Sequence, residues 1–157
     1  FLKNGTLIYS GNRDEAINFY NKNENFIFRD SYIKGKVIKA NLLEGLTEIK
    51  LGKDSLTVFS NTLHLDQNVI VKIKATDIII STIIPDKLSS LNYLKTNIEE
   101  VVFQQGLACL ILNYENNIIK ALLTKKSYRK LNIKKGMQCY AIIKALNIND
   151  VTNVNLV

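Results

Sequence analysis

Few side chains in this sequence have the type and spacing that chemistry requires. The two cysteines, Cys109 and Cys139, lack the spacing of metal ligands and stand within apolar strand patterns, so we expect buried, unreactive thiols. The single histidine, His64, has no carboxylate or hydroxyl pattern around it, and Glu99 and Glu100 are typical of a solvated strand face. The sequence therefore predicts neither a metal site nor a catalytic centre.

The glycine loop of ATP-binding proteins is also missing from the sequence. No segment matches G-x-x-x-x-G-K-[ST], whose backbone N–H groups cradle phosphates and whose lysine reaches them. We therefore expect no ATP hydrolysis by the chain as given, and no enzyme activity or cofactor of its own.

Positive charge is the clearest feature of the composition. The 157 residues carry a formal net charge of +7, and only three of the 21 basic residues are arginines. Lysine is a point charge without the fork that recognises phosphates or bases in a bidentate way. The lysines are scattered among isoleucines and asparagines, which is typical of a compositional bias. A basic surface that attracts anions or nucleic acid is the alternative.

The length suits one ordinary domain or two very small ones. The longest apolar run covers residues 76–85 and contains Asp77, whereas roughly 20 apolar residues are needed to span a bilayer, so no transmembrane segment is expected. The chain opens at Phe1 rather than at a methionine, which is consistent with a piece cut from a longer protein.

Short β-rich runs separated by turn residues fill the sequence from residue 31 onward. Their apolar and polar patterns predict strands over residues 32–40, 46–51, 56–59, 68–74 and 78–84. The helical stretches are short and cover residues 14–20 and 127–131. Pro85 and the polar residues 86–90 form the best candidate boundary inside the chain.

An internal repeat is the strongest signal in the sequence. Residues 35–51 align without a gap with residues 96–112, at an offset of 61. Further on, Lys74-Ala75 meets Lys144-Ala145 at an offset of 70. The difference is an insertion of nine residues, which we place on residues 125–133, at the predicted short helix.

Each half then contains about five short strands, and the second half carries a helix between its third and fourth strands. Five strands with one helix before the fourth is the outline of an OB-type barrel. We therefore predict an all-β fold of two OB-like five-stranded barrels, the second with a short helix, preceded by a short N-terminal strand and helix. A unit of about 60 residues buries only about 60% of its unfolded surface. The halves should therefore pack against each other or against a second chain.

The second half resembles the Mop module, a molybdate- and tungstate-binding member of the TOBE group of transport-associated OB domains. The resemblance rests on residues 89–92, on residues 121–124 with Ser127 after them, on residues 131–136 and on residues 140–145. In the first half, residues 71–78 are similar to the partner TOBE-like unit. Both units occur in the C-terminal extension of the ATPase subunit of molybdate ABC importers.

The start of the chain fits the same placement, because residues 2–20 resemble the last strand and tail helix of an ABC nucleotide-binding domain. The resemblance divides the chain into an ATPase tail over residues 1–28, a first TOBE-like unit over residues 29–85 and a Mop-like unit over residues 86–157. It implies an upstream ATPase domain, where ATP would bind, a membrane permease as partner, and a homodimer. The implied location is cytoplasmic, peripheral on the inner face of the cell membrane through the permease, with no nucleic acid partner.

The resemblance also implies a site for molybdate or tungstate at the contact between Mop modules of different chains. By position, Ser89 would supply a hydroxyl or a backbone N–H, and Asn92 would hold the loop. Thr124 and Ser127 would donate from the start of the inserted helix, where unpaired N–H groups also favour an anion. Lys144 would supply the positive charge.

Two departures from the family pattern weaken this site. The family has an arginine where this chain has Leu91 and a serine where it has Ala145. A hydrogen bond to a charged group contributes roughly 1.5–3 kcal/mol, so losing two costs on the order of 3–5 kcal/mol. The site residues also have structural roles open to them: the helix hydroxyls as caps, Ser89 and Asn92 as turn formers, and Lys144 as a solvated lysine.

The sequence leaves three functions open. The chain is a regulatory, accessory domain of a molybdate or tungstate importer ATPase that binds the oxyanion, or a dimerisation and docking module of such an importer that binds no ligand. The third is an OB protein for nucleic acid. It is disfavoured because aromatic residues make up only 8% of the chain, include no tryptophan and show no cluster on one strand face.

Overall fold

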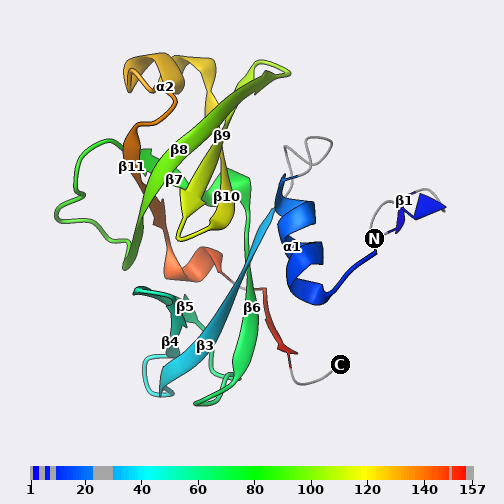
Figure 1. The fold of residues 1–157 in the computed structure, drawn as a ribbon. Coiled ribbons are helices and arrows are strands. Elements are labelled where there is room, and N and C mark those ends of the chain that lie inside the picture. Colours follow the sequence, from blue (N-terminus) through cyan, green and yellow to red (C-terminus); the bar gives the residue numbers. More distant parts are fainter. Residues whose placement is uncertain (1, 4–5, 8–9, 23–29, 149, 155–157) are drawn as a thin grey trace.

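The computed structural model describes residues 2–3, 6–7, 10–22, 30–148 and 150–154, which form a mainly β structure. As predicted, two curled five-stranded sheets in OB-like units make up most of it, one above the other in Figure 1. The first sheet contains β3 (Ser31–Asn41), β4 (Leu46–Leu51), β5 (Asp54–Phe59), β6 (Asn68–Ile73) and β12 (Val151–Asn153). The second contains β7 (Ile79–Ser81), β8 (Asn92–Gln104), β9 (Leu107–Tyr114), β10 (Asn117–Thr124) and β11 (Gln138–Ile143).

The N-terminal part of the chain forms a small hairpin and a helix. β1 (Leu2–Lys3) pairs with β2 (Thr6–Leu7), and α1 (Arg13–Lys22) is the helix that the sequence predicts there. α1 packs against β3 and β10, which belong to different sheets. An ion pair between Asp14 and Lys34 adds to this contact. The helix therefore lies at the junction of the two sheets.

Among the described residues, three further short helical elements belong to the two halves. α2 (Lys125–Lys130) lies close to the predicted helix 127–131. The 3-10 turns η2 (Ala75–Asp77) and η3 (Ala145–Asn147) follow β6 and β11. In the described part of the chain, no helix has the length and apolar character needed to cross a membrane.

The strands predicted in the first half are confirmed, with one difference in length. The last of them, predicted over residues 78–84, is reduced to the three residues of β7. The Ser81 hydroxyl donates to the Ile83 carbonyl oxygen at 2.7 Å and accepts the Ile83 N–H at 3.3 Å. This local pairing competes with the strand ladder and ends β7 before Pro85.

The internal repeat is visible in the backbone. β3 has a β-bulge between Val37 and Lys39, and β8 has one between Ile98 and Glu100, at the predicted offset of 61. A bulge bends its strand and increases the twist. The two sheets therefore curl at equivalent places.

In each half, an equivalent hydrogen bond joins the bulged strand to the residue just before the fourth strand of that half. The Val37 N–H donates to the Gln67 carbonyl oxygen at 2.9 Å. The Ile98 N–H donates to the Met137 carbonyl oxygen at 2.8 Å. The residue before each acceptor has a positive φ, 67° at Asp66 and 83° at Gly136. Glycine adopts this conformation freely and Asp tolerates it, so an aspartate can take the place of the glycine.

The nine inserted residues of the second half are not all at the helix, and the sequence-based placement was wrong in this respect. The β4–β5 hairpin has six residues on each strand, whereas the β9–β10 hairpin has eight on each. Four of the nine residues therefore lengthen the hairpin, and five lie between β10 and β11, where α2 is. The alignment could not separate them because the hairpin tips, Gly52-Lys53 and Glu115-Asn116, share no residue.

The last strand of each sequence half is exchanged between the sheets. β7 pairs with β11, and β12 pairs with β6, both antiparallel. The strand order is β12-β6-β3-β4-β5 in the first sheet and β10-β9-β8-β11-β7 in the second. Residues 29–85 and 86–157, the predicted TOBE-like and Mop-like units, therefore do not form separate sheets.

Two buried polar side chains tie the sheets together at equivalent places. The Asn92 amide, at the start of β8, accepts the Thr57 N–H of β5 at 2.7 Å and donates to the Thr57 carbonyl oxygen at 2.8 Å. It also donates to the Ile143 carbonyl oxygen at 3.0 Å. Ser31, at the start of β3, accepts the backbone N–H of Lys120 in β10 at 2.9 Å. The strand with the β-bulge in each sheet, β3 or β8, is thus bonded at its start to the second strand of the hairpin in the other sheet, β10 or β5.

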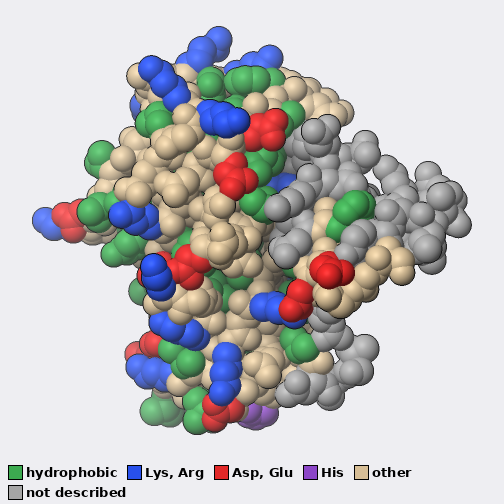
Figure 2. All heavy atoms as spheres, in the orientation of Figure 1, with side chains coloured by type: hydrophobic (Ala, Val, Ile, Leu, Met, Phe, Trp, Pro, Cys, Tyr) green, Lys and Arg blue, Asp and Glu red, His purple; other side chains and the backbone are tan. Residues whose placement is uncertain are grey.

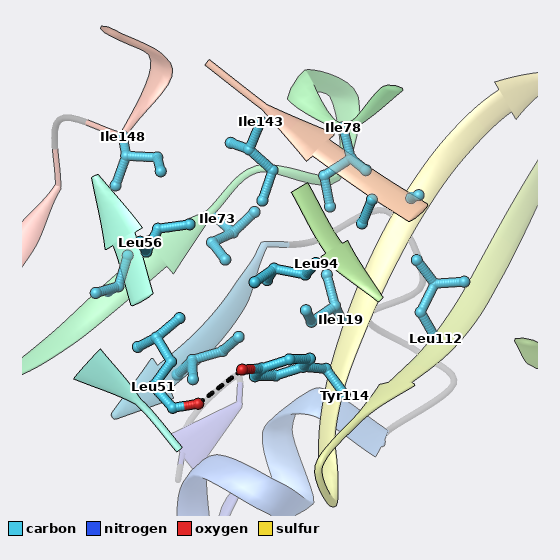
Figure 3. Close-up of a cluster of buried hydrophobic side chains, with 14 of the residues drawn as sticks. Leu51, Leu56, Ile73, Ile78, Leu94, Leu112, Tyr114, Ile119, Ile143 and Ile148 are labelled. Atoms are coloured by element: carbon cyan, nitrogen blue, oxygen red, sulfur yellow. Dashed lines mark hydrogen bonds between the residues drawn. The ribbon is translucent and has the colours of Figure 1, made fainter. Parts of the chain in front are cut away.

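One hydrophobic core runs through both sheets. Figure 3 shows some of its buried side chains: Leu51, Leu56 and Ile73 from the first sheet, beside Leu94, Ile119 and Ile143 from the second. Burial of one such side chain contributes about 1.5–3 kcal/mol. These residues pack against one another across the contact between the two sheets, called here the seam. We therefore expect the two halves to fold together.

Tyr114, at the end of β9, also crosses the seam. Its buried hydroxyl donates to the Leu51 carbonyl oxygen at 2.8 Å, marked in Figure 3, and accepts the Asp54 N–H at 3.3 Å. Burial raises the pKa of Tyr114 to about 12.

Tyr114→Phe is expected to lower the free energy of unfolding by about 1–2 kcal/mol at neutral pH, because the Leu51 carbonyl loses its partner. A raised tyrosine pKa contributes stability that is complete below the unfolded value of 10.0 and is lost as the pH rises through the folded value of about 12. In that window the variant should lose stability less steeply, by about 1.4 kcal/mol per pH unit. Urea unfolding at several pH values measures the slope, and equal slopes in both proteins would contradict the buried hydroxyl.

Candidate oxyanion site

The structure separates the five predicted site residues into three places. Ser89 and Lys144 line one groove. Thr124 and Ser127 line a second. Asn92 is buried at the seam between the sheets. One copy of the described chain therefore does not bring the predicted ligand set together.

The first groove, called here the Lys144 groove, has a volume of about 400 Å³. Its polar lining comes from three segments: Thr76 and Asp77 of η2, Ser89 and Ser90 before β8, and Lys144 and Asn147 at η3. Its apolar lining is Ile79, Leu88 and Ile142. Lys144 is exposed and takes part in none of the ion pairs seen among the described residues. The groove thus offers an ammonium group beside hydroxyls, which suits an oxyanion.

Ser90 lines this groove but was not predicted, and its hydroxyl has a structural role. It donates to the Ile143 carbonyl oxygen at 2.8 Å and lies 3.1 Å from the Asn92 carbonyl oxygen. The contact fixes the segment that carries Ser89 against β11, beside Lys144. It could not be predicted from local sequence, because only the pairing of β8 with β11 brings these residues together.

The second groove, called here the Thr124 groove, has a volume of about 370 Å³ and lies between β7, the end of β10 and α2. Thr124 is the N-cap of α2: its Oγ1 accepts the Ser127 N–H at 3.1 Å, and the two hydroxyl oxygens are 3.0 Å apart. The capping role that the sequence left open is therefore present. Both residues are exposed, so capping and contact with an anion are compatible.

Asn92 is engaged by the backbone around it. Its side-chain amide makes three hydrogen bonds, and the residue is only 2% exposed. An amide has one acceptor oxygen and two donor hydrogens, so contact with an anion would require breaking one of these bonds. In this structure Asn92 holds the start of β8, and its role as a ligand stays a prediction.

β7 lies between the two grooves and is an edge strand of the second sheet. Ile79 of β7 lines both grooves and is 60% exposed. Ile83, Leu88 and Leu91, in the segment after β7, are also exposed. Strand edges and apolar side chains gathered in this way are surfaces for association.

Basic side chains gather around α2, although the lysines are spread along the sequence. Lys125, Lys126, Arg129 and Lys130 are all exposed, and Figure 2 shows basic side chains at this end of the molecule. Lys130 also lines the Thr124 groove. Such a patch raises the local concentration of anions.

The cysteines line neither groove. Both are buried, as predicted, and neither forms a disulfide. Burial raises the pKa of the Cys109 thiol to about 11, and it also raises the pKa of Cys139. Both therefore stay protonated and unreactive at neutral pH. Within the described residues, no three His, Cys, Asp or Glu side chains gather in a way that could hold a metal ion.

The fold of the chain is similar to that of a solved structure. The chain is similar to the cytoplasmic molybdate-binding protein ModG, in a crystal form with molybdate bound, with a TM-score of 0.66 and 21% identical residues. The match covers 78% of this chain and 95% of that one. No family model and no curated protein matches the sequence. At this identity the likeness establishes the fold, and the ligand must be argued from the site.

Proposed function

We propose that this chain is a Mop-type module that binds molybdate or tungstate at a contact between two copies. The observation that carries the proposal is the pair of grooves beside β7, each lined by two of the five predicted site residues. A tetrahedral anion needs donors from several directions. A second copy on the β7 edge would bring Thr124 and Ser127 of one chain toward Ser89 and Lys144 of the other.

Two further observations support this function. The exposed apolar residues of β7 and the segment after it would be covered by the second copy. The fold is that of ModG, whose solved structure holds molybdate.

The cellular role that fits best is an accessory C-terminal domain of an oxyanion importer's ATPase subunit, held at the inner face of the cell membrane through the permease. It is supported by the resemblance of residues 2–20 to the end of an ABC nucleotide-binding domain. α1, in that segment, contacts strands of both sheets. By linkage, an anion that favours one arrangement of two copies would change the arrangement of attached ATPase domains.

Titration calorimetry with sodium molybdate and sodium tungstate tests the proposal. We expect a saturable heat below millimolar ligand, at no more than one anion per chain, and a shift toward dimers in analytical ultracentrifugation on adding the anion. Sodium chloride at the same ionic strength is the control. A folded chain that gives no heat with millimolar molybdate or tungstate does not have this function.

A second function, dimerisation and docking without a ligand, is favoured by the residues at two family positions. Leu91 is 59% exposed where the family has an arginine, and Ala145 stands where the family has a serine. The predicted site therefore has one cation instead of two. The signature of this function is a stable dimer whose melting temperature does not change with molybdate. The oxyanion-binding function predicts a different result, because a ligand at 100 times its Kd should add about 2.7 kcal/mol to the free energy of unfolding.

A further inference from the structure

The Lys144 groove contains a carboxylate as well as an ammonium group. Asp77 of η2 and Lys144 of η3 both line it, and none of the ion pairs among the described residues joins them. The two turns meet because β7, which follows η2, pairs with β11, which precedes η3. At the repeat offset of 70, the residue equivalent to Asp77 is Asn147, which carries no charge.

Asp77 also accepts the hydrogen bond of the neighbouring Thr76 hydroxyl. Thr76 Oγ1 donates to Asp77 Oδ1 at 3.1 Å. A hydroxyl has a single hydrogen to donate. Thr76 therefore presents only lone pairs to the groove, although its residue type suggests a donor. The carboxylate acts against a bare oxyanion in two ways, by repulsion and by withholding this hydrogen.

We propose that Asp77 makes the Lys144 groove favour oxyanions that keep a proton over those that have none. An ionised carboxylate only accepts hydrogen bonds. Near neutral pH, inorganic phosphate retains a proton that it can donate to Asp77, while its other oxygens face Lys144 and the hydroxyl of Ser89. Molybdate and tungstate have no proton to donate under these conditions and meet the carboxylate as a like charge.

This inference rests on the proposed function, because it assumes that the Lys144 groove holds an oxyanion. It identifies a residue that limits the affinity for molybdate in this chain. Asp77→Asn keeps the size of the side chain and removes its charge. For a doubly charged anion a few ångströms from the carboxylate, we expect molybdate to bind about tenfold more tightly to the variant. Phosphate should gain much less, since it loses the charged acceptor for its proton.

The test is titration calorimetry of the full chain, the Asp77→Asn variant and a matched Asp66→Asn variant, each with sodium molybdate and sodium phosphate at neutral pH and constant ionic strength. Asp66 lines neither groove, and its positive φ of 67° is tolerated by asparagine. The control variant therefore changes the net charge equally, away from the Lys144 groove.

We expect the ratio of molybdate to phosphate affinity to rise about tenfold in Asp77→Asn and to stay within about twofold of the parent in Asp66→Asn. An equal gain for both anions in Asp77→Asn, or the same change in the control, would overturn the role of Asp77 and leave the proposed function intact. Absence of binding of either anion to all three folded proteins would overturn the proposed function, and this inference with it.

Discussion

Lys144→Ala should weaken molybdate binding about 100-fold, because Lys144 is the only charged group among the five predicted site residues and a charge-assisted hydrogen bond contributes roughly 1.5–3 kcal/mol. The fold should not suffer. Lys144 is exposed, and its side chain caps nothing at η3. The free energy of unfolding should therefore stay within about 0.5 kcal/mol of the parent value. Titration calorimetry gives the affinity, and urea unfolding gives the stability of the same sample.

The repeat supplies the control variant, Lys74→Ala. Lys74 precedes η2 as Lys144 precedes η3, with similar extended backbone angles, φ −76° and ψ 130° against φ −69° and ψ 138°. It lines neither groove. Its loss should change the molybdate affinity by no more than about twofold. Equal losses in the two variants would mean that the overall positive charge holds the anion, rather than the Lys144 groove.

The fold could be predicted because the signal repeats along the chain. Gapless alignment of residues 35–51 with 96–112 places two strands and the turn between them in both halves, and the structure has bulges and positive-φ glycines at matching positions, such as Gly45 and Gly106. These features depend on neighbours close in sequence, so the pattern of residue types is enough to indicate them.

The exchange of β7 and β12 could not be predicted in this way. β11 pairs with β7, from the first half of the sequence, and the three residues of β7 are too few for their pattern to distinguish one sheet edge from the other. What decides between them is the path of the chain through η2 and η3, which is a tertiary property. The Lys144 groove depends on the same path, so its composite lining from both halves was also missed.

Lys120 shows a second limit of predicting burial from the pattern of residue types along a strand. A lysine in a strand normally indicates the solvated face, yet Lys120 in β10 is 1% exposed, and burial lowers its pKa. β10 contacts α1 and β3 in addition to its partner in the sheet. The period of two within a strand says nothing about elements that cover its outer face.

Asn92→Ala should destabilise the chain by about 3 kcal/mol, because it leaves the Thr57 N–H and the Thr57 and Ile143 carbonyls without their side-chain partner. The intrinsic affinity of the folded variant for molybdate should stay the same. Urea unfolding measures the first quantity, and calorimetry at low temperature, where the variant stays folded, measures the second.

The matched variant is Ser31→Ala, at the equivalent end of β3, where one hydrogen bond to Lys120 is lost. Ser31→Ala should lower the free energy of unfolding by about 1 kcal/mol. The destabilisation by the two variants should therefore be proportional to the number of seam hydrogen bonds that each removes. If Asn92 touches the anion instead, its alanine variant should lose more than about tenfold in affinity, and Ser31→Ala should lose none. The seam and the ligand roles of Asn92 thus predict opposite pairs of results, and the three backbone hydrogen bonds favour the seam.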